Sequence, residues 1–140
     1  MSNPAIIDAG PLIALLDASD QHHAWAIAQF AAIRAPLLTC EAVLAEALFI
    51  LRKLRPAQEQ IRDWMADGVL EVAFSLQREA QAVKSLWARY ANVPISIADA
   101  SLVRMAELYR GTPICTLDSD FTIYRLRGRE PIPLLSPSAS

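Results

Sequence analysis

The sequence predicts an α/β protein, specifically a three-layer α/β/α sandwich with a central parallel sheet. Short apolar runs typical of strands alternate with longer stretches that have helical periodicity. The run at residues 5–7 is apolar without alternation, as expected for a strand that is covered on both faces. Strands that alternate with helices form right-handed βαβ units, in which consecutive strands run parallel.

The first half of the chain contains two predicted strands and four predicted helices. The first strand ends at Asp8, and the Gly10–Pro11 step opens a short helix over residues 12–17. Asp20 is a suitable cap for a second helix, and Pro36 leads into a strand at residues 37–40. Two further helices are expected, a mostly buried one that begins at Thr39 or Glu41 and ends at Arg55, and a second over residues 57–66 that stops at Gly68.

The second half continues the alternation of strands and helices. Residues 69–74 alternate as a third strand, and Ser75 can cap a helix over residues 76–90. Residues 97–109 are helical in pattern and end just before Gly111. The remaining elements expected are a strand at 113–117, a short helical turn capped by Asp118, and a fifth strand at 132–135.

Composition limits the class of protein. A chain of 140 residues is the size of one domain, which we expect to cover residues 1–140. With 54% hydrophobic residues and a mean hydropathy of +0.25, some apolar surface is expected to be covered by a second copy or another protein. No apolar run reaches the roughly 20 residues of a membrane span. Two separated cysteines and no basic leader indicate a reduced, cytoplasmic protein.

Four acidic residues are candidates for chemistry, and each has a simpler alternative. Asp8 before Ala-Gly-Pro can form a turn, and Asp118 can be a helix cap. Ser96 and Asp99 have the spacing of a capping box. Glu46 has apolar neighbours three and four positions to either side, so we expect it to be desolvated and therefore paired, protonated or metal-bound.

Together the four acids point to a metal site. The predicted elements place all of them at one edge of the sheet, the edge where ligands bind in open α/β folds. Carboxylates that converge without a lysine repel one another unless a hard divalent cation lies among them, and Mg²⁺ or Mn²⁺ is the natural occupant. Such a metal activates water and orients a phosphodiester for in-line attack.

The sequence resembles a PIN domain of the small prokaryotic type found in VapC toxin ribonucleases, along nearly its whole length. The resemblance rests on residues 7–12 around Asp8, 39–51 around Glu46, 96–100 around Asp99, and 116–121 around Asp118. It implies a sheet of strand order 3-2-1-4-5, Mg²⁺-dependent endoribonuclease activity, and metal ligation by these four acids. In one respect the chain departs from the family, because many members carry Ser or Thr where this chain has Gly10.

Other residues are weaker candidates. Arg125 and Arg127 belong to the densest basic cluster, which either binds phosphate or is a solvated loop. Thr116 and Asp120 are further candidates for substrate contacts. Cys40 and Cys115 adjoin predicted strand ends and are expected in the core.

The resulting prediction is a metal-dependent endoribonuclease that acts on RNA as the toxin of a toxin–antitoxin pair. The resemblance also implies an antitoxin partner, and the apolar composition favours a homodimer. The alternative is a catalytically silent PIN module that only binds RNA or protein. A phospho-receiver domain is disfavoured, because it requires a lysine after a late strand and no lysine follows Lys84.

Overall fold

A parallel five-stranded sheet lies at the centre of the protein, which a computed structural model describes for residues 3–137. Its order is β3-β2-β1-β4-β7, and every neighbouring pair is parallel. The strands are β1 (Ile6–Ile7), β2 (Leu37–Thr39), β3 (Leu70–Val72), β4 (Ile114–Cys115) and β7 (Leu134–Leu135). The predicted order 3-2-1-4-5 is confirmed, because β7 is the strand expected at residues 132–135.

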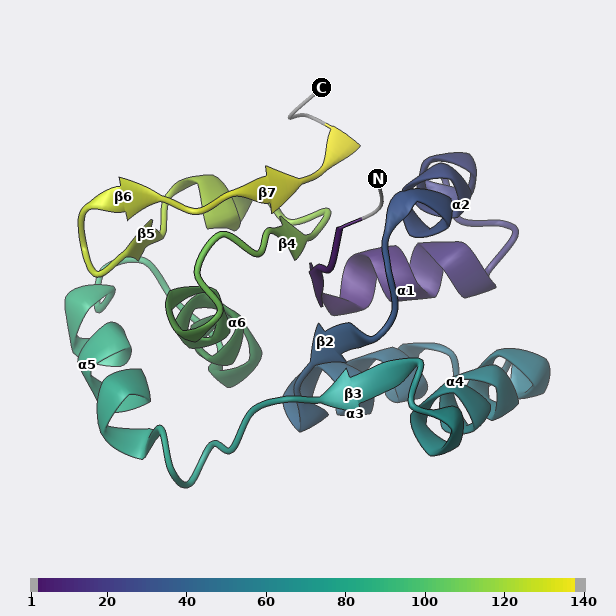
Figure 1. The fold of residues 1–140 in the computed structure, drawn as a ribbon, viewed down its shortest axis with the longest axis horizontal. Coiled ribbons are helices and arrows are strands. Elements are labelled where there is room, and N and C mark those ends of the chain that lie inside the picture. Colours follow the sequence, from purple (N-terminus) through teal and green to yellow (C-terminus); the bar gives the residue numbers. More distant parts are fainter. Residues whose placement is uncertain (1–2, 138–140) are drawn as a thin grey trace.

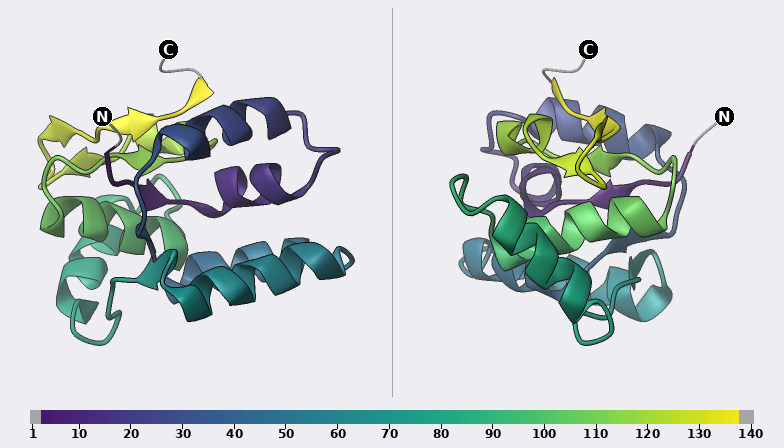
Figure 2. Two further views of the ribbon diagram at one scale, coloured as in Figure 1. Left: turned by 45° about the vertical axis from the view of Figure 1, so that its right-hand side comes forward. Right: turned by 90° about the vertical axis from the view of Figure 1, so that its left-hand side faces the viewer.

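Helices cover both faces of the sheet, which confirms the predicted sandwich. In Figure 1, α5 and α6 lie on one side of the sheet and α1, α2 and α4 on the other, and the turned views of Figure 2 agree. The helices are α1 (Ala9–Leu16), α2 (His23–Ala32), α3 (Glu41–Ile50), α4 (Arg55–Asp67), α5 (Ala80–Arg89) and α6 (Ile97–Leu108).

The central strand is buried on both sides. Ala5, Ile6 and Ile7 are fully inaccessible to solvent, which explains why this run is apolar without alternation. Ile6 is paired with Leu38 on one side and with Ile114 on the other. The residues that follow β1 and β4 therefore meet at the same edge of the sheet.

Three helix boundaries differ from the prediction by three or more residues, each for a local reason. Helix α1 begins at Ala9, because Asp8 accepts a hydrogen bond from the Ala9 amide and Pro11 suits a first turn. Helix α3 ends at Ile50 instead of Arg55, since Arg55 and Pro56 already form the first turn of α4. Helix α5 begins at Ala80, later than expected, because the preceding residues form a separate turn.

A two-stranded antiparallel hairpin lies outside the main sheet and was not predicted. It consists of β5 (Arg125–Leu126) and β6 (Glu130–Pro131). Its turn contains Arg127 and Gly128, with φ of 53° and 73°. The Arg127 amide donates to Glu107 Oε2 at 2.7 Å, and Glu107 in turn receives a bond from Arg104 at 3.1 Å. Helix α6 thereby anchors the hairpin.

Within residues 3–137, no helix is both long enough and apolar enough to cross a membrane.

Candidate functional site

The four predicted acids line one pocket at the carboxyl edge of the sheet. The pocket has a volume of about 470 Å³, and its lining contains no arginine, lysine or histidine. The lining residues are Asp8, Ala9, Gly10, Glu46, Ser96, Asp99, Leu117 and Asp118. The structure therefore brings together acids that come from four separate segments of the chain.

Asp8 is the most rigidly held of the four acids. Its Oδ1 accepts a hydrogen bond from the Ala9 amide, and its Oδ2 accepts one from Thr116 Oγ1, both at 2.7 Å. The pKa of Asp8 is raised, chiefly by burial and also by the charges of Glu46 and Asp118, while the two hydrogen bonds act in the opposite direction. The bond from the Ala9 amide is the local turn that was the alternative role predicted for Asp8. Asp8 forms this turn and also lines the pocket.

Asp99 lies in the first turn of α6. Ser96 caps this helix, and its Oγ accepts the Asp99 amide at 3.0 Å. The Asp99 carboxylate itself accepts a bond from Tyr124, so the side chain faces the site while only the backbone takes part in capping. Burial first, and then the charges of Asp8 and Asp118, raise the pKa of Asp99 to about 6.

Glu46 is exposed, so the expectation that it is desolvated is wrong. Helix α3 buries Val43, Leu44 and Ala47 against the core, and Glu46 lies on the solvent-exposed face. Its apolar neighbour Phe49 on this face is itself 62% exposed, so apolar sequence neighbours did not produce an apolar environment. The mostly buried helix that the sequence predicted is therefore buried on one face only.

Asp118 both caps a helix and lines the pocket. Its Oδ1 accepts the Asp120 amide at 2.9 Å at the start of the 3₁₀ helix η1 (Ser119–Thr122). The Asp118 amide donates to Thr116 Oγ1 at 3.0 Å, so a single threonine hydroxyl links Asp8 to the loop of Asp118. Asp120 is outside the lining of the pocket.

The donor set suits a hard divalent cation. All the charged side chains of the lining are carboxylates, and those of Asp8 and Asp99 are held near other negative charges with no cation to offset them. As placed, however, no three His, Cys, Asp or Glu side chains among residues 3–137 are close enough together to hold a metal ion. Glu46 has an exposed side chain that can rotate toward a bound cation, whereas Asp118, although exposed, is held through Oδ1 by the Asp120 amide.

A family model described as the PIN domain matches residues 5–126, a span that includes all four acids. The chain belongs to the PIN domain family. No curated protein matches it.

Among solved structures, this PIN domain is similar to VapC20 of Mycobacterium tuberculosis, a toxin that cleaves the sarcin-ricin loop. The TM-score is 0.72 and the sequence identity is 22%, over 87% of this chain and 94% of VapC20. At this identity the similarity is one of fold.

The structure accounts for Gly10, where this PIN domain departs from many relatives. A Cβ atom at this position would lie 3.3 Å from Leu117 Cβ and Cδ1, so a serine or threonine would crowd that side chain. The hydroxyl that bonds Asp8 comes instead from Thr116, on the neighbouring strand segment.

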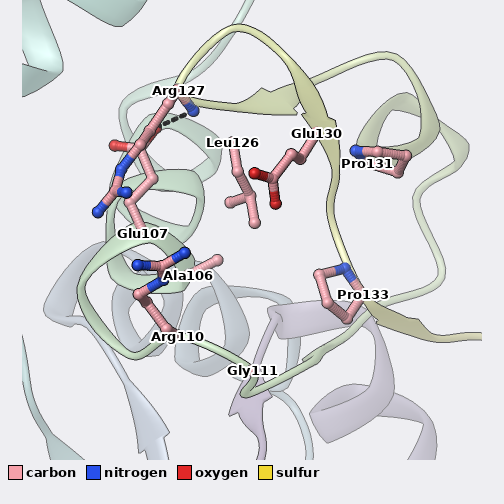
Figure 3. A pocket seen from close by; sticks show the side chains of 9 residues that line it. All are labelled: Ala106, Glu107, Arg110, Gly111, Leu126, Arg127, Glu130, Pro131 and Pro133. Atoms are coloured by element: carbon pink, nitrogen blue, oxygen red, sulfur yellow. Dashed lines mark hydrogen bonds between the residues drawn. The ribbon is translucent and has the colours of Figure 1, made fainter.

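Neither of the two candidate arginines lines the acidic pocket. The Arg125 guanidinium donates to the backbone carbonyls of Thr122 and Tyr124, at 2.6 and 3.0 Å. Arg127 lines a second pocket of about 220 Å³ with Glu107 and Arg110 (Figure 3). This lining includes Gly111, three residues before the start of β4. Because β4 ends near the acids, this second pocket is at the opposite edge of the sheet.

Tyr124 is a residue of the site that the sequence analysis missed. It is fully buried, and its hydroxyl lies 3.3 Å from Asp99 Oδ2. The only signal in the sequence was the spacing of Phe121 and Tyr124, which places two aromatic rings on one face of a short helical turn. The cysteines are in the core as expected, and burial raises the pKa of Cys115 to about 12.

Proposed function

We propose that this PIN domain is a Mg²⁺- or Mn²⁺-dependent endoribonuclease that acts as the toxin of a toxin–antitoxin pair. The observation that carries the proposal is the pocket of four carboxylates without a cationic side chain. The fold it shares with VapC20, a toxin that cleaves RNA at the sarcin-ricin loop, supports the choice of RNA as substrate.

In this proposal Asp8 and Asp99 are the main metal ligands, and Glu46 and Asp118 complete or position the site. A bound metal would lower the pKa of a coordinated water molecule and would neutralise negative charge on the scissile phosphate. The protein contributes orientation: Thr116 and the Ala9 amide hold Asp8, and the start of α6 holds Asp99. The expected products carry 5′-phosphate and 3′-hydroxyl ends.

RNA cleavage by the purified chain tests the proposal. We expect cleavage with Mg²⁺ or Mn²⁺, none in excess EDTA, and near-complete loss in Asp8→Asn, which keeps the shape of the side chain and removes its charge. Asp63→Asn is the matched control, because Asp63 is an exposed acid on α4 outside the pocket. Cleavage that persists in EDTA, or that survives Asp8→Asn, would refute the metal mechanism.

The proposal includes two protein partners in the cytoplasm. Exposed apolar side chains such as Phe49 and Ile50 favour a homodimer, which light scattering of the free protein tests. An antitoxin is expected to present an arginine or lysine to the four acids, since a guanidinium forms two charge-assisted bonds to carboxylates. Expression of the chain without its antitoxin should arrest growth of its own host, whereas expression of Asp8→Asn should not; unaffected growth would remove the toxin role.

A catalytically silent PIN module that binds RNA is the second candidate. It is favoured by Gly10, which lacks the hydroxyl found in many relatives, and by carboxylates that are not pre-arranged as a metal cluster among the described residues. RNA binding without cleavage at any tested concentration of Mg²⁺ or Mn²⁺ would establish this candidate in place of the first.

A further inference from the structure

Tyr124 lies in a cluster of three aromatic rings beside the acidic pocket. Its ring contacts Tyr90 with a centroid distance of 5.1 Å and Phe121 with one of 5.4 Å, both edge to face. The side chain is fully buried in the segment between η1 and β5. Burial and these two ring contacts therefore restrict where its hydroxyl can lie.

The Tyr124 hydroxyl has two acceptors within reach, and one of them is charged. It lies 3.3 Å from Asp99 Oδ2 and 3.4 Å from the Pro94 carbonyl oxygen. A hydroxyl has a single proton to donate, and an ionised carboxylate is a stronger acceptor than a backbone carbonyl. The proton is therefore donated to Asp99.

This bond leaves one oxygen of Asp99 for the pocket. The torsion that turns a carboxylate about its last bond is soft, so an Asp99 side chain without a partner would sample many orientations. The bond to Oδ2 restricts this rotation. Rotation of Asp8 is restricted further, because the Ala9 amide bonds one of its oxygens and the Thr116 hydroxyl bonds the other.

We propose that Tyr124 is a positioning residue that orients the Asp99 carboxylate toward a divalent cation. The inference rests on the proposed function, because it requires the pocket to bind a metal. Groups that hydrogen-bond to metal ligands orient those ligands, and their removal weakens metal binding by about 10- to 100-fold.

Two phenylalanine substitutions separate positioning from packing. Tyr124→Phe removes the hydroxyl at Asp99 and keeps the ring. Tyr90→Phe is the matched control, because it removes a hydroxyl from the same cluster, one that accepts the Arg125 amide at 2.7 Å and does not contact an acid of the pocket. Mn²⁺ affinity of the full chain is measured by titration calorimetry or by the paramagnetic resonance of free Mn²⁺, and folding by thermal melts in EDTA.

We expect Mn²⁺ binding to weaken about 10-fold in Tyr124→Phe and to stay unchanged in Tyr90→Phe. RNA cleavage by Tyr124→Phe should fall at limiting Mn²⁺ and recover at high Mn²⁺, which a purely structural defect would not do. Equal Mn²⁺ affinity in the wild type and Tyr124→Phe would overturn the inference, as would an equal loss in both variants. A wild-type chain that binds no Mn²⁺ would instead refute the proposed function, and the inference with it.

Discussion

Replacing Asp99 by asparagine should stabilise the metal-free protein. A carboxyl group whose pKa is higher in the folded than in the unfolded chain holds its proton more tightly when folded. The pKa of Asp99 rises from 3.8 to about 6, so the free energy of unfolding falls as the pH rises through this interval. At pH 7.5 the charged Asp99 therefore destabilises the fold, and an amide of the same shape removes this effect.

The size of the gain follows from the same shift. From 3.8 to about 6, at about 1.4 kcal/mol per pKa unit, the upper limit is about 3 kcal/mol. Because Asp99 is only partly buried, screening by solvent reduces the expected gain to about 1 kcal/mol. The gain should disappear near pH 4, where the wild-type carboxyl is protonated in the folded chain.

Urea unfolding in EDTA at pH 7.5 and at pH 4 measures this effect, with Glu41→Gln as the control. Glu41 is also an acid in the first turn of a helix, but it is exposed and outside the pocket. Loss of its charge should cost up to about 0.5 kcal/mol, through the helix dipole. Saturating Mg²⁺, at about 100 times its dissociation constant, should stabilise the wild type by about 2.7 kcal/mol and Asp99→Asn by less. If Asp99→Asn loses stability in EDTA as Glu41→Gln does, the argument from the raised pKa of Asp99 is wrong.

Three further substitutions test the structure around the pocket. Thr116→Val removes the hydroxyl bonded to Asp8 and should lower the free energy of unfolding, measured in urea, by about 1.5–3 kcal/mol. A decrease below about 0.5 kcal/mol would show that this bond does not stabilise the fold. At an open helical position, Gly→Ala raises the free energy of unfolding by about 1 kcal/mol. We expect no increase for Gly10→Ala, because the new Cβ crowds Leu117, and we expect the increase to reappear in a Leu117→Ala background. Glu107→Gln should lower the free energy of unfolding by about 1–3 kcal/mol, since Arg104 keeps its ion pair with Glu79, and should speed amide exchange in the hairpin. Unchanged exchange would refute the anchoring role of Glu107.

The sheet and the gathering of the acids could be predicted because they depend on local patterns. The apolar run before Asp8 and the turn residues after it define a buried strand whose carboxyl end is known. The Ser96–Asp99 spacing likewise marks the start of α6, and Gly111 its end. Once the strands are parallel, these end points fall at one edge whatever the details of packing.

Burial and contacts between distant residues could not be predicted in the same way. Glu46 has apolar neighbours in sequence, yet α3 turns that face outward, because which side of a helix meets the core depends on the elements packed against it. The bond from Tyr124 to Asp99 spans 25 residues and depends on how α6, β4 and η1 bring the chain back to the start of α6. The hairpin turn at Arg127 is held by Glu107, 20 residues away, so the sequence around the basic cluster did not indicate a hairpin.

The bond between Thr116 and Asp8 joins residues that are 108 positions apart. During synthesis, Asp8, Glu46 and Asp99 all leave the ribosome before β4, the strand that pairs with β1 and carries the chain to Thr116 and Asp118. Until β4 and the residues after it are made, β1 has no neighbouring strand on one side, and the pocket lacks Leu117 and Asp118. A growing chain, or one that is terminated early, therefore cannot assemble the site. For the proposed ribonuclease, this order of assembly means that a chain terminated before residue 116 would lack both the Thr116 hydroxyl that holds Asp8 and the Asp118 carboxylate of the pocket.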